Sequence, residues 1–387
     1  MMNPQVSLLN KSTTLKITAL TKKLIREGKD VVNFAGGEPD FDTPLFIKEE
    51  AKSAIDKGLT KYTPSAGRIE LKQAIATKLN RENNIKASAN NIIVTAGAKY
   101  AIFVAMFSVL AHGDEVIIPS PYWVSYPEMV KLTSAKAVVL PTKRTNDFKI
   151  DPVELEKAIT PNTKLLILNY PCNPTGVTYT KEELEAILKV AKEKNILVLS
   201  DEIYEALVYD GRKHISFASL PGAFKSTITI NGFSKTFSMT GWRIGYLVAD
   251  ESIVNQISKI IDHTTSCASS ISQSAALAAL GNKDWQEEIR IKFQDRRDLI
   301  WEGLSKFLEL KPIKPQGTFY LFCDIRGSGL NSFDFSTRLL EDFLTSCIPA
   351  DPFGQEGYLR FSFSTSLEQI TKGVNRVGDF LASLKNN

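Results

Sequence analysis

The chain has 387 residues, of which 43% are hydrophobic and 23% charged, so it can bury a large core, and its length favours two lobes over one. The formal net charge of +4 is small for this length and predicts no nucleic-acid partner. Four cysteines without a Cys-x-x-Cys pair, together with only three histidines, argue against a metal site.

The N-terminal residues 1–11 contain no long apolar run, so we do not expect them to be a signal peptide. Residues 103–110 are apolar but too few to span a bilayer, which predicts no membrane partner. Scattered free thiols are typical of a reducing compartment. We therefore expect a cytoplasmic protein.

From residue 43 to residue 248, helices and strands are predicted to alternate. Thr43 is expected to cap a helix that ends near Gly58, and Thr180 with Glu183 forms a capping box that opens another helix over 180–194. The other segments of this region are a helix at Ala98–Ala111 and strands at Ile92–Thr95, Val116–Pro119, Ala137–Leu140, Leu165–Asn169, Ile196–Ser200, Thr227–Asn231 and Ile244–Val248. This alternation predicts an α/β fold, with a large lobe whose central sheet is mainly parallel.

After residue 284 the pattern changes. A long amphipathic helix is predicted over 285–308, and two strands, at 319–323 and 358–363, flank a helix near 333–346. This order indicates a second, smaller α+β lobe, which the N-terminal segment is expected to join. The predicted division is a large domain at residues 46–282 and a small domain at residues 1–45 and 283–387.

Residues that can bind a ligand or take part in a reaction follow five of the predicted strands. Ligands of an open parallel sheet bind beyond the carboxyl ends of its strands, so we expect these groups to share one site. In chain order they are Gly97-Ala98-Lys99, Trp123, Asn173, Asp201 with Tyr204, and Lys235. Each has an ordinary structural explanation as well: a helix cap for Asp201, the core for Trp123, a turn for Asn173. Only their convergence on one sheet edge indicates a function.

This set suits an aromatic, phosphorylated cofactor that carries a carbonyl group. The helix that starts after Gly97 can hold a phosphate through its backbone N–H groups and its dipole. Trp123 can stack on a ring, and Asp201 can pair with a protonated pyridine nitrogen. Lys235 can condense with an aldehyde.

The segment Gly232–Gly245 reads GFSKTFSMTGWRIG and resembles the lysine signature of the class I pyridoxal-phosphate-dependent aminotransferases. Asn173-Pro174-x-Gly176, Asp201-x-x-Tyr204 and Arg360 match the family's other markers in order. The resemblance covers nearly the whole chain. It is closest to the prokaryotic aspartate aminotransferases, a group that includes prephenate aminotransferases, and it implies the fold-type I architecture with the cofactor on the large domain.

The resemblance assigns the groups that contact the cofactor ring. Lys235 resembles the lysine that carries pyridoxal 5'-phosphate as a Schiff base and moves the proton. Asp201 resembles the partner of the pyridine nitrogen, and Asn173 and Tyr204 the pair at the ring oxygen. Trp123 resembles the residue that stacks on the ring. Lys235, Asp201 and Tyr204 are therefore the expected catalytic residues.

The same resemblance assigns the phosphate site. Arg243, with the backbone N–H groups of Ala98 and Lys99, resembles the set of phosphate ligands. Tyr62 resembles a tyrosine that reaches the phosphate of the neighbouring subunit, which implies a homodimer with active sites at its interface. Ala98 replaces a common glycine here, and a backbone donor tolerates that change. Cys172 stands where relatives often carry asparagine.

On the substrate side, Arg360 resembles the clamp for the α-carboxylate, and Gly37 a backbone contact to it. Trp123 and Asn173 are expected to contact the substrate as well as the cofactor. We interpret Lys99 as the cation for a second carboxylate, although it can instead serve only to neutralise the cofactor phosphate. Thr14 resembles a residue that folds over the substrate.

The implied reaction is transamination between an amino acid, with aspartate and glutamate as the leading pair, and a 2-oxo acid such as oxaloacetate or 2-oxoglutarate. Prephenate or arogenate, or aromatic amino acids, are alternative substrates, and a C–S β-lyase is an alternative activity on the same fold. A non-catalytic regulator would need an additional DNA-binding segment. A nicotinamide-dependent oxidoreductase would need a Gly-x-Gly-x-x-Gly motif after an early strand, and the sequence has none.

Overall fold

A computed structural model describes residues 4–7, 9 and 14–385 of the chain. Its largest sheet has seven strands in the order β2-β8-β7-β6-β5-β3-β4. Only β8 runs antiparallel to its neighbours, and the other pairs are parallel, so the prediction of a mainly parallel sheet is confirmed. The strands are β2 (Ile92–Thr95), β3 (Glu115–Ser120), β4 (Lys136–Pro141), β5 (Thr163–Asn169), β6 (Leu197–Asp201), β7 (Thr227–Gly232) and β8 (Gly245–Val248).

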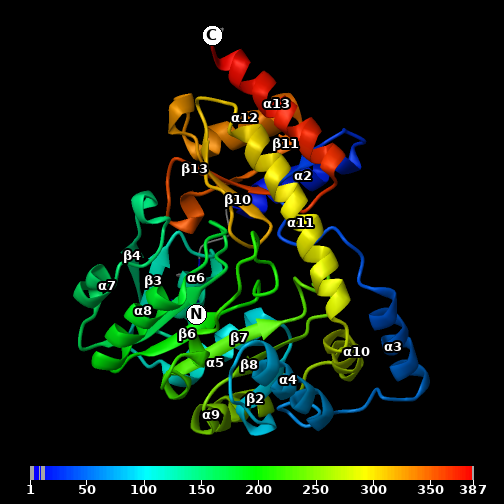
Figure 1. The fold of residues 1–387 in the computed structure, drawn as a ribbon, viewed down its shortest axis with the longest axis vertical. Coiled ribbons are helices and arrows are strands. Elements are labelled where there is room, and N and C mark those ends of the chain that lie inside the picture. Colours follow the sequence, from blue (N-terminus) through cyan, green and yellow to red (C-terminus); the bar gives the residue numbers. More distant parts are fainter. Residues whose placement is uncertain (1–3, 8, 10–13, 386–387) are drawn as a thin grey trace.

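Helices cover both faces of this sheet (Figure 1). One face packs against α5 (Ala98–Val109), α6 (Ser125–Leu132) and α9 (Glu251–Asp262). The other face packs against two groups of helices, α7 (Pro152–Ala158) with α8 (Lys181–Glu193), and α3 (Leu45–Asp56) with α4 (Ile69–Glu82) and α10 (Ser270–Leu280). Burial on both faces explains why residues 165–168 form an unbroken apolar run.

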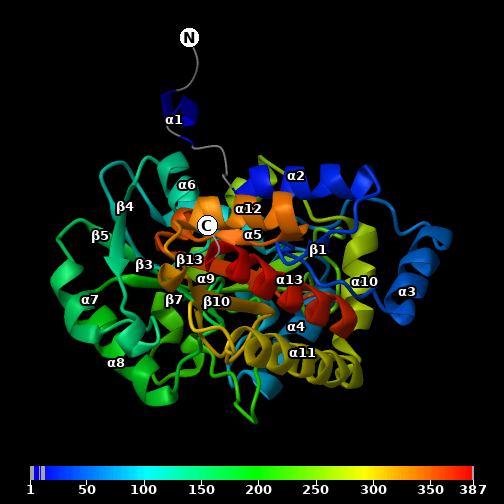
Figure 2. The same cartoon turned by 90° about the horizontal axis from the view of Figure 1, so that it is seen from above.

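A second group of elements lies above the end of this sheet (Figures 1 and 2). Its four-stranded antiparallel sheet has the order β12-β13-β10-β9. A pair of short parallel strands, β1 and β11, joins the N-terminal part of the chain to the C-terminal part. The elements are β1 (Val32–Asn33), β9 (Lys311–Pro312), β10 (Tyr320–Asp324), β11 (Thr345–Ser346), β12 (Ile348–Pro349) and β13 (Tyr358–Ser362), with α1 (Pro4–Ser7), α2 (Thr14–Arg26), α11 (Lys283–Leu304), α12 (Ser332–Phe343) and α13 (Leu367–Lys385).

Several helix boundaries differ from the prediction by a few residues, and two of these differences have a visible cause. Helix α3 begins at Leu45 and its N-cap is Pro44, because the hydroxyl of Thr43 instead accepts from Trp242 Nε1 at 3.0 Å and donates to the carbonyl oxygen of Ser238 at 2.6 Å. The helix predicted near 333–346 ends at Phe343, because Leu344 takes a left-handed conformation and the next two residues pair with β1. The capping box of Thr180 with Glu183 is confirmed. The domain boundaries at 45/46 and 282/283 stay a prediction.

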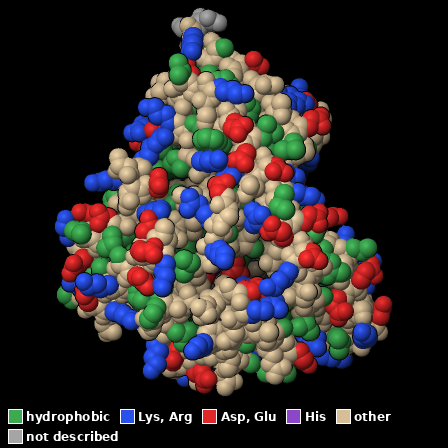
Figure 3. All heavy atoms as spheres, viewed as in Figure 1, with side chains coloured by type: hydrophobic (Ala, Val, Ile, Leu, Met, Phe, Trp, Pro, Cys, Tyr) green, Lys and Arg blue, Asp and Glu red, His purple; other side chains and the backbone are tan. Residues whose placement is uncertain are grey.

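The surface agrees with the small net charge. On the face in Figure 3, lysine and arginine side chains alternate with aspartate and glutamate side chains, and no single charge covers a large area. Among the described residues, no helix combines the length and the apolar character needed to cross a membrane.

Candidate active site

A cavity of about 530 Å³ lies where the carboxyl ends of the parallel strands meet the four-stranded sheet. It collects ten of the predicted site residues, which come from eight separate stretches of chain. These ten are Gly37, Ala98, Lys99, Trp123, Asn173, Asp201, Tyr204, Lys235, Arg243 and Arg360. The rule that places ligands beyond the carboxyl ends of parallel strands thus located the cavity from the sequence.

Lys235 follows β7 and extends into the cavity. Its Nζ donates to the carbonyl oxygen of Gly37 at 2.5 Å and lies 5.8 Å from the centre of the Tyr204 ring. Burial lowers the pKa of Lys235 to about 8, and the positive charge of Arg360 acts in the same direction. An amine with this pKa is partly neutral near neutral pH, as a nucleophile or a proton acceptor must be.

Asp201 ends β6 and is 4% exposed. Its carboxylate accepts a hydrogen bond from Tyr126 Oη at 2.7 Å and one from the backbone N–H of Ile203 at 3.3 Å. Burial raises the pKa of Asp201 to about 6, and the hydrogen bond from Tyr126 partly opposes that rise. A cation placed against this carboxylate favours its charged form.

The start of α5 forms a cradle for an anion. Its N-cap, Gly97, has φ of 91°, and a Cβ there would lie 2.6 Å from a guanidinium nitrogen of Arg243. Only glycine therefore lets Arg243 lie against the helix start. The guanidinium is held by the carbonyl oxygen of Thr240 at 2.8 Å. Helix N–H groups without intrahelical partners, next to a fixed cation, are the features of a phosphate site.

Arg360, on β13, forms a second anion-binding group. It is 7% exposed, and it donates to Asn173 Oδ1 at 3.0 Å. Its guanidinium carbon lies 4.2 Å from the centre of the Tyr320 ring. Its Nε is buried and has no hydrogen-bond partner among the described residues. A planar guanidinium fixed in this way matches a carboxylate, which can accept two parallel hydrogen bonds.

Two further predicted residues lie at the side of the cavity. Lys99 Nζ is 4.8 Å from the centre of the Trp123 ring, and this ring packs edge-on against Tyr126 at 5.3 Å. Burial lowers the pKa of Lys99, and the charge of Arg243 adds to this effect. Lys99 therefore lies against the Trp123 ring and belongs to the first turn of α5, which forms the anion cradle.

Two predicted residues are not placed in the cavity. Tyr62 is 89% exposed and lines a different hollow, together with Arg68 and Lys72. Thr14 begins α2, but its side chain lies outside the described part of the structure. Thr18, one turn further along α2, does line the cavity.

The sequence reasoning missed two tyrosines of the site. Tyr320 Oη lies 3.1 Å from Tyr204 Oη, and the same ring supports Arg360. It stands in an apolar segment that looks like an ordinary core strand, so nothing in the pattern singled it out. Tyr126 lies three residues beyond Trp123, but its contact with Asp201 depends on the turn into α6.

Cys172 lies beside the site and does not line the large cavity. Its Sγ is 3.8 Å from the carbonyl oxygen of Pro121. Burial raises the pKa of this thiol, which favours its protonated form.

Comparison with known proteins gives the same family throughout. Residues 29–377 match the family model described as aminotransferase class I and II. The chain is 44% identical to the aspartate aminotransferase of Bacillus sp. (strain YM-2) over 384 residues, which cover 97% of this chain and 98% of the relative. It is 42% identical to the bifunctional aspartate aminotransferase and glutamate/aspartate-prephenate aminotransferase of Petunia hybrida, over 99% of this chain and 83% of the relative. The structure of the Thermus thermophilus aspartate aminotransferase with maleate has a TM-score of 0.94 and 39% identity, covering 98% of this chain and 99% of that chain.

The lowered pKa of Lys235 leads to a prediction about its reactivity. A small reagent that modifies amines should label Lys235 of the ligand-free protein at a rate that rises with pH and reaches half of its maximum near pH 8. The neutral amine is the form that reacts. Lys157, whose pKa is raised by Glu154, should react only at higher pH. Peptide mass mapping measures both rates in one sample.

The variant Arg360→Gln supplies the control. Removing that positive charge should move the midpoint of Lys235 labelling to higher pH, since the charge of Arg360 helps to lower this pKa. A Lys235 midpoint near 10.5 in the unmodified protein, the ordinary value for lysine, would contradict the description of the site.

Proposed function

Because the chain belongs to the class I and II aminotransferases, we propose that it transfers the amino group of aspartate or glutamate to a 2-oxo acid. The observation that carries the proposal is the convergence of Lys235, Asp201 and Arg360 on one cavity that also contains a phosphate cradle. An amine, a buried carboxylate and a carboxylate clamp are the protein groups that transamination requires.

Enzymes of this family use pyridoxal 5'-phosphate, and the residues of the cavity fit its polar groups. Lys235 is positioned to bind its aldehyde carbon. Arg243 and the first turn of α5 would hold the phosphate, and the position of the guanidinium over Gly97 supports this assignment. Asp201 would face the ring nitrogen, where a proton gives the buried carboxylate the cation that its environment lacks.

The remaining contacts follow from the same placement. Trp123 would stack on the ring, while Asn173 and Tyr204 would hydrogen-bond its oxygen. Tyr204 is already oriented by Tyr320, and Asn173 by Arg360. When bound, the cofactor supplies an electron sink for negative charge that develops at the substrate Cα.

Side chains of the protein orient the substrate and move the proton. Arg360 grips the α-carboxylate, which fixes the direction of the Cα–H bond. Once the substrate amine has replaced it at the aldehyde carbon, the Lys235 amine, partly neutral because its pKa is about 8, would take the proton from the substrate Cα and return it to that carbon of the cofactor. Asp201 keeps a proton on the ring nitrogen throughout. Gly37 contributes a backbone contact at the same edge of the cavity, next to Lys235.

A dicarboxylic substrate is favoured by the position of Lys99. It lines the same cavity as Arg360, from the start of α5. Proteins named as aspartate aminotransferases among the relatives, and maleate in one solved relative, support this choice. Prephenate also carries a second carboxylate and remains the alternative substrate, in line with the bifunctional Petunia relative. A C–S β-lyase would release pyruvate, a thiol and ammonia instead of a new amino acid.

We further propose that the enzyme is a homodimer. Tyr62 is 89% exposed and does not reach the cavity of its own chain, which supports its assignment to the phosphate of a neighbouring subunit. Exposed apolar side chains lie near it in the chain, at Leu45, Ile55, Leu59 and Ile69. A cytoplasmic location is proposed as well, and the four free cysteines support it.

The first test of the function is covalent trapping. Borohydride reduction of the protein after incubation with pyridoxal 5'-phosphate should fix the label on Lys235, as found by peptide mass mapping. Subsequent addition of aspartate to an unreduced sample should discharge the absorbance of the lysine-bound cofactor. Label on a different lysine, or no label at all, would refute the proposed function.

The second test concerns substrate choice. Lys99→Ala should raise KM for aspartate by roughly ten- to a hundredfold, because one charge-assisted bond of about 1.5–3 kcal/mol is lost. KM for phenylalanine, which has no second carboxylate, should change much less. Equal losses for both substrates would mean that Lys99 serves the cofactor phosphate instead.

The third test concerns the dimer. Light scattering should give twice 42.9 kDa at assay concentration. Tyr62→Ala should weaken cofactor binding, and Lys235→Ala should abolish covalent binding. A mixed dimer of these two variants contains one site with both native residues, so mixing them should restore tight binding to half of the Lys235 sites. An active monomer, or mixing without any restoration, would contradict a shared site.

A further inference from the structure

A second carboxylate is buried directly behind Asp201. Glu202 is the next residue along the chain, its side chain is fully buried, and the mechanism above does not use it. One of its oxygens accepts from Ser200 Oγ at 2.7 Å, from Ser216 Oγ at 2.9 Å and from the backbone N–H of Phe217 at 3.2 Å. A buried carboxylate is strongly destabilising unless donors of this kind surround it, so these three donors hold Glu202 in one fixed position.

The other oxygen of Glu202 is hydrogen-bonded to His214. His214 Nε2 lies 2.9 Å from it, and the imidazole stacks on the ring of Tyr170 with the ring centres 5.1 Å apart. His214 Nδ1 is buried and has no partner among the described residues. This geometry fits the neutral tautomer that carries its proton on Nε2 and donates it to the carboxylate. His214 and the two serines then all donate to the Glu202 carboxylate.

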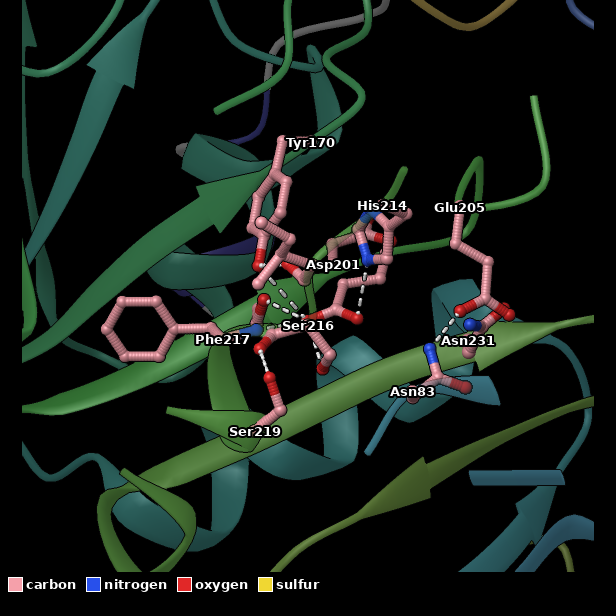
Figure 4. A network of polar contacts seen from close by, with 12 residues as sticks. Asn83, Tyr170, Asp201, Glu205, His214, Ser216, Phe217, Ser219 and Asn231 are labelled. Carbon is pink, nitrogen blue, oxygen red and sulfur yellow. Dashed lines mark hydrogen bonds and ion pairs between the residues drawn. The ribbon is translucent and has the colours of Figure 1, made fainter. Parts of the chain in front are cut away.

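The cluster is not a cation site. Glu202, Glu205 and His214 each offer an atom within 4.8 Å of the others, the spacing of a possible metal centre. Glu205, however, already binds the ammonium group of Lys78 and accepts from Asn83 Nδ2 at 2.5 Å. Figure 4 shows Asn83 and Glu205 at one end of the network, with His214 and Asp201 beside them. One carboxylate of this set is therefore already paired with a cation, Lys78.

The network is connected to Asp201 through the backbone. The N–H of Glu202 donates to the carbonyl oxygen of Ile230 at 3.0 Å, so the ladder between β6 and β7 continues one residue past Asp201. The carbonyl oxygen of Asp201 accepts from the N–H of Tyr170 at 3.2 Å, and Tyr170 is the residue that stacks on His214. Side chains alternate between the faces of a strand, so Asp201 and Glu202 point to opposite sides of the sheet.

We propose that Glu202, held by His214 and Ser216, is a positioning residue for Asp201. The carboxylate of Glu202 anchors the end of β6 from the face of the sheet opposite the cavity, while Tyr126 holds Asp201 from the cavity side. The fixed negative charge of Glu202 also adds to that of Asp201 in attracting a proton on the ring nitrogen. The inference rests on the proposed function, because it concerns the ring nitrogen of pyridoxal 5'-phosphate.

A pair of ligands separates this role from a general loss of structure. The cofactor-free protein is titrated with pyridoxal 5'-phosphate and with an analogue whose ring nitrogen is replaced by carbon. Both ligands have the aldehyde and the phosphate, but only the first has the nitrogen that faces Asp201. Glu202→Gln keeps the size of the side chain and removes its charge. It should weaken binding of pyridoxal 5'-phosphate about tenfold, or about 1.4 kcal/mol, and weaken binding of the analogue less than about twofold.

A matched pair of serines keeps the test valid if Glu202→Gln does not fold. Ser216→Ala removes a donor to Glu202, whereas Ser219→Ala removes a hydroxyl that donates only to the carbonyl oxygen of Ser216, at 2.6 Å. Both residues lie in the same short segment, visible in Figure 4. Ser216→Ala should show the selective loss for pyridoxal 5'-phosphate, and Ser219→Ala should show none.

Two results would overturn the inference: equal losses for both ligands, or no loss in either Glu202→Gln or Ser216→Ala. Either result leaves the proposed function intact as long as the unmodified protein binds pyridoxal 5'-phosphate on Lys235. Failure of the unmodified protein to bind it would refute the proposed function itself, so the two failures are distinguishable.

Discussion

The burial of one carboxylate at the end of a strand is the constraint on which the rest of the site depends. Asp201 can face a ligand only if the parallel sheet carries it to the base of the cavity, and burial there raises its pKa to about 6. Tyr126 and the N–H of Ile203 offset part of this cost. A protonated ring nitrogen would offset more of the cost of burying this carboxylate, because a neighbouring positive charge stabilises the charged form of Asp201.

The opposite pressure acts on Lys235. Burial lowers its pKa to about 8, and the charges of Arg360 and Arg243 add to the effect. The two arginines that attract the anionic ends of the ligands therefore also keep the lysine partly neutral. One arrangement of charge thus explains both binding and proton transfer, as is common where titratable groups in a cleft have strongly shifted pKa values.

How much the sequence predicted depends on the range of the forces involved. Asp201 ends β6 and Lys235 follows β7, and because these two strands are parallel neighbours, strand direction alone brings the two residues together. Tyr320 and Glu202 could not be predicted in this way. Tyr320 contacts Tyr204, which is 116 residues away in the chain, at 3.1 Å, and Glu202 contacts His214 at 2.9 Å only because the irregular segment after β6 folds back. Boundaries failed for a related reason: Thr43 bonds to Ser238 across the fold and is lost as a helix cap.

Two hydrogen bonds connect the four-stranded sheet to the large sheet across the cavity. Arg360 on β13 donates to Asn173, which follows β5 of the large sheet. Tyr320 on β10 hydrogen-bonds Tyr204, which follows β6. The position of the Arg360 guanidinium is therefore tied to the packing of the four-stranded sheet against the large one. Lys99, in contrast, stands on the first turn of α5 at the side of the cavity, with its Nζ 4.8 Å from the centre of the Trp123 ring. The side of the cavity that Lys99 lines is therefore held separately from the link that positions Arg360.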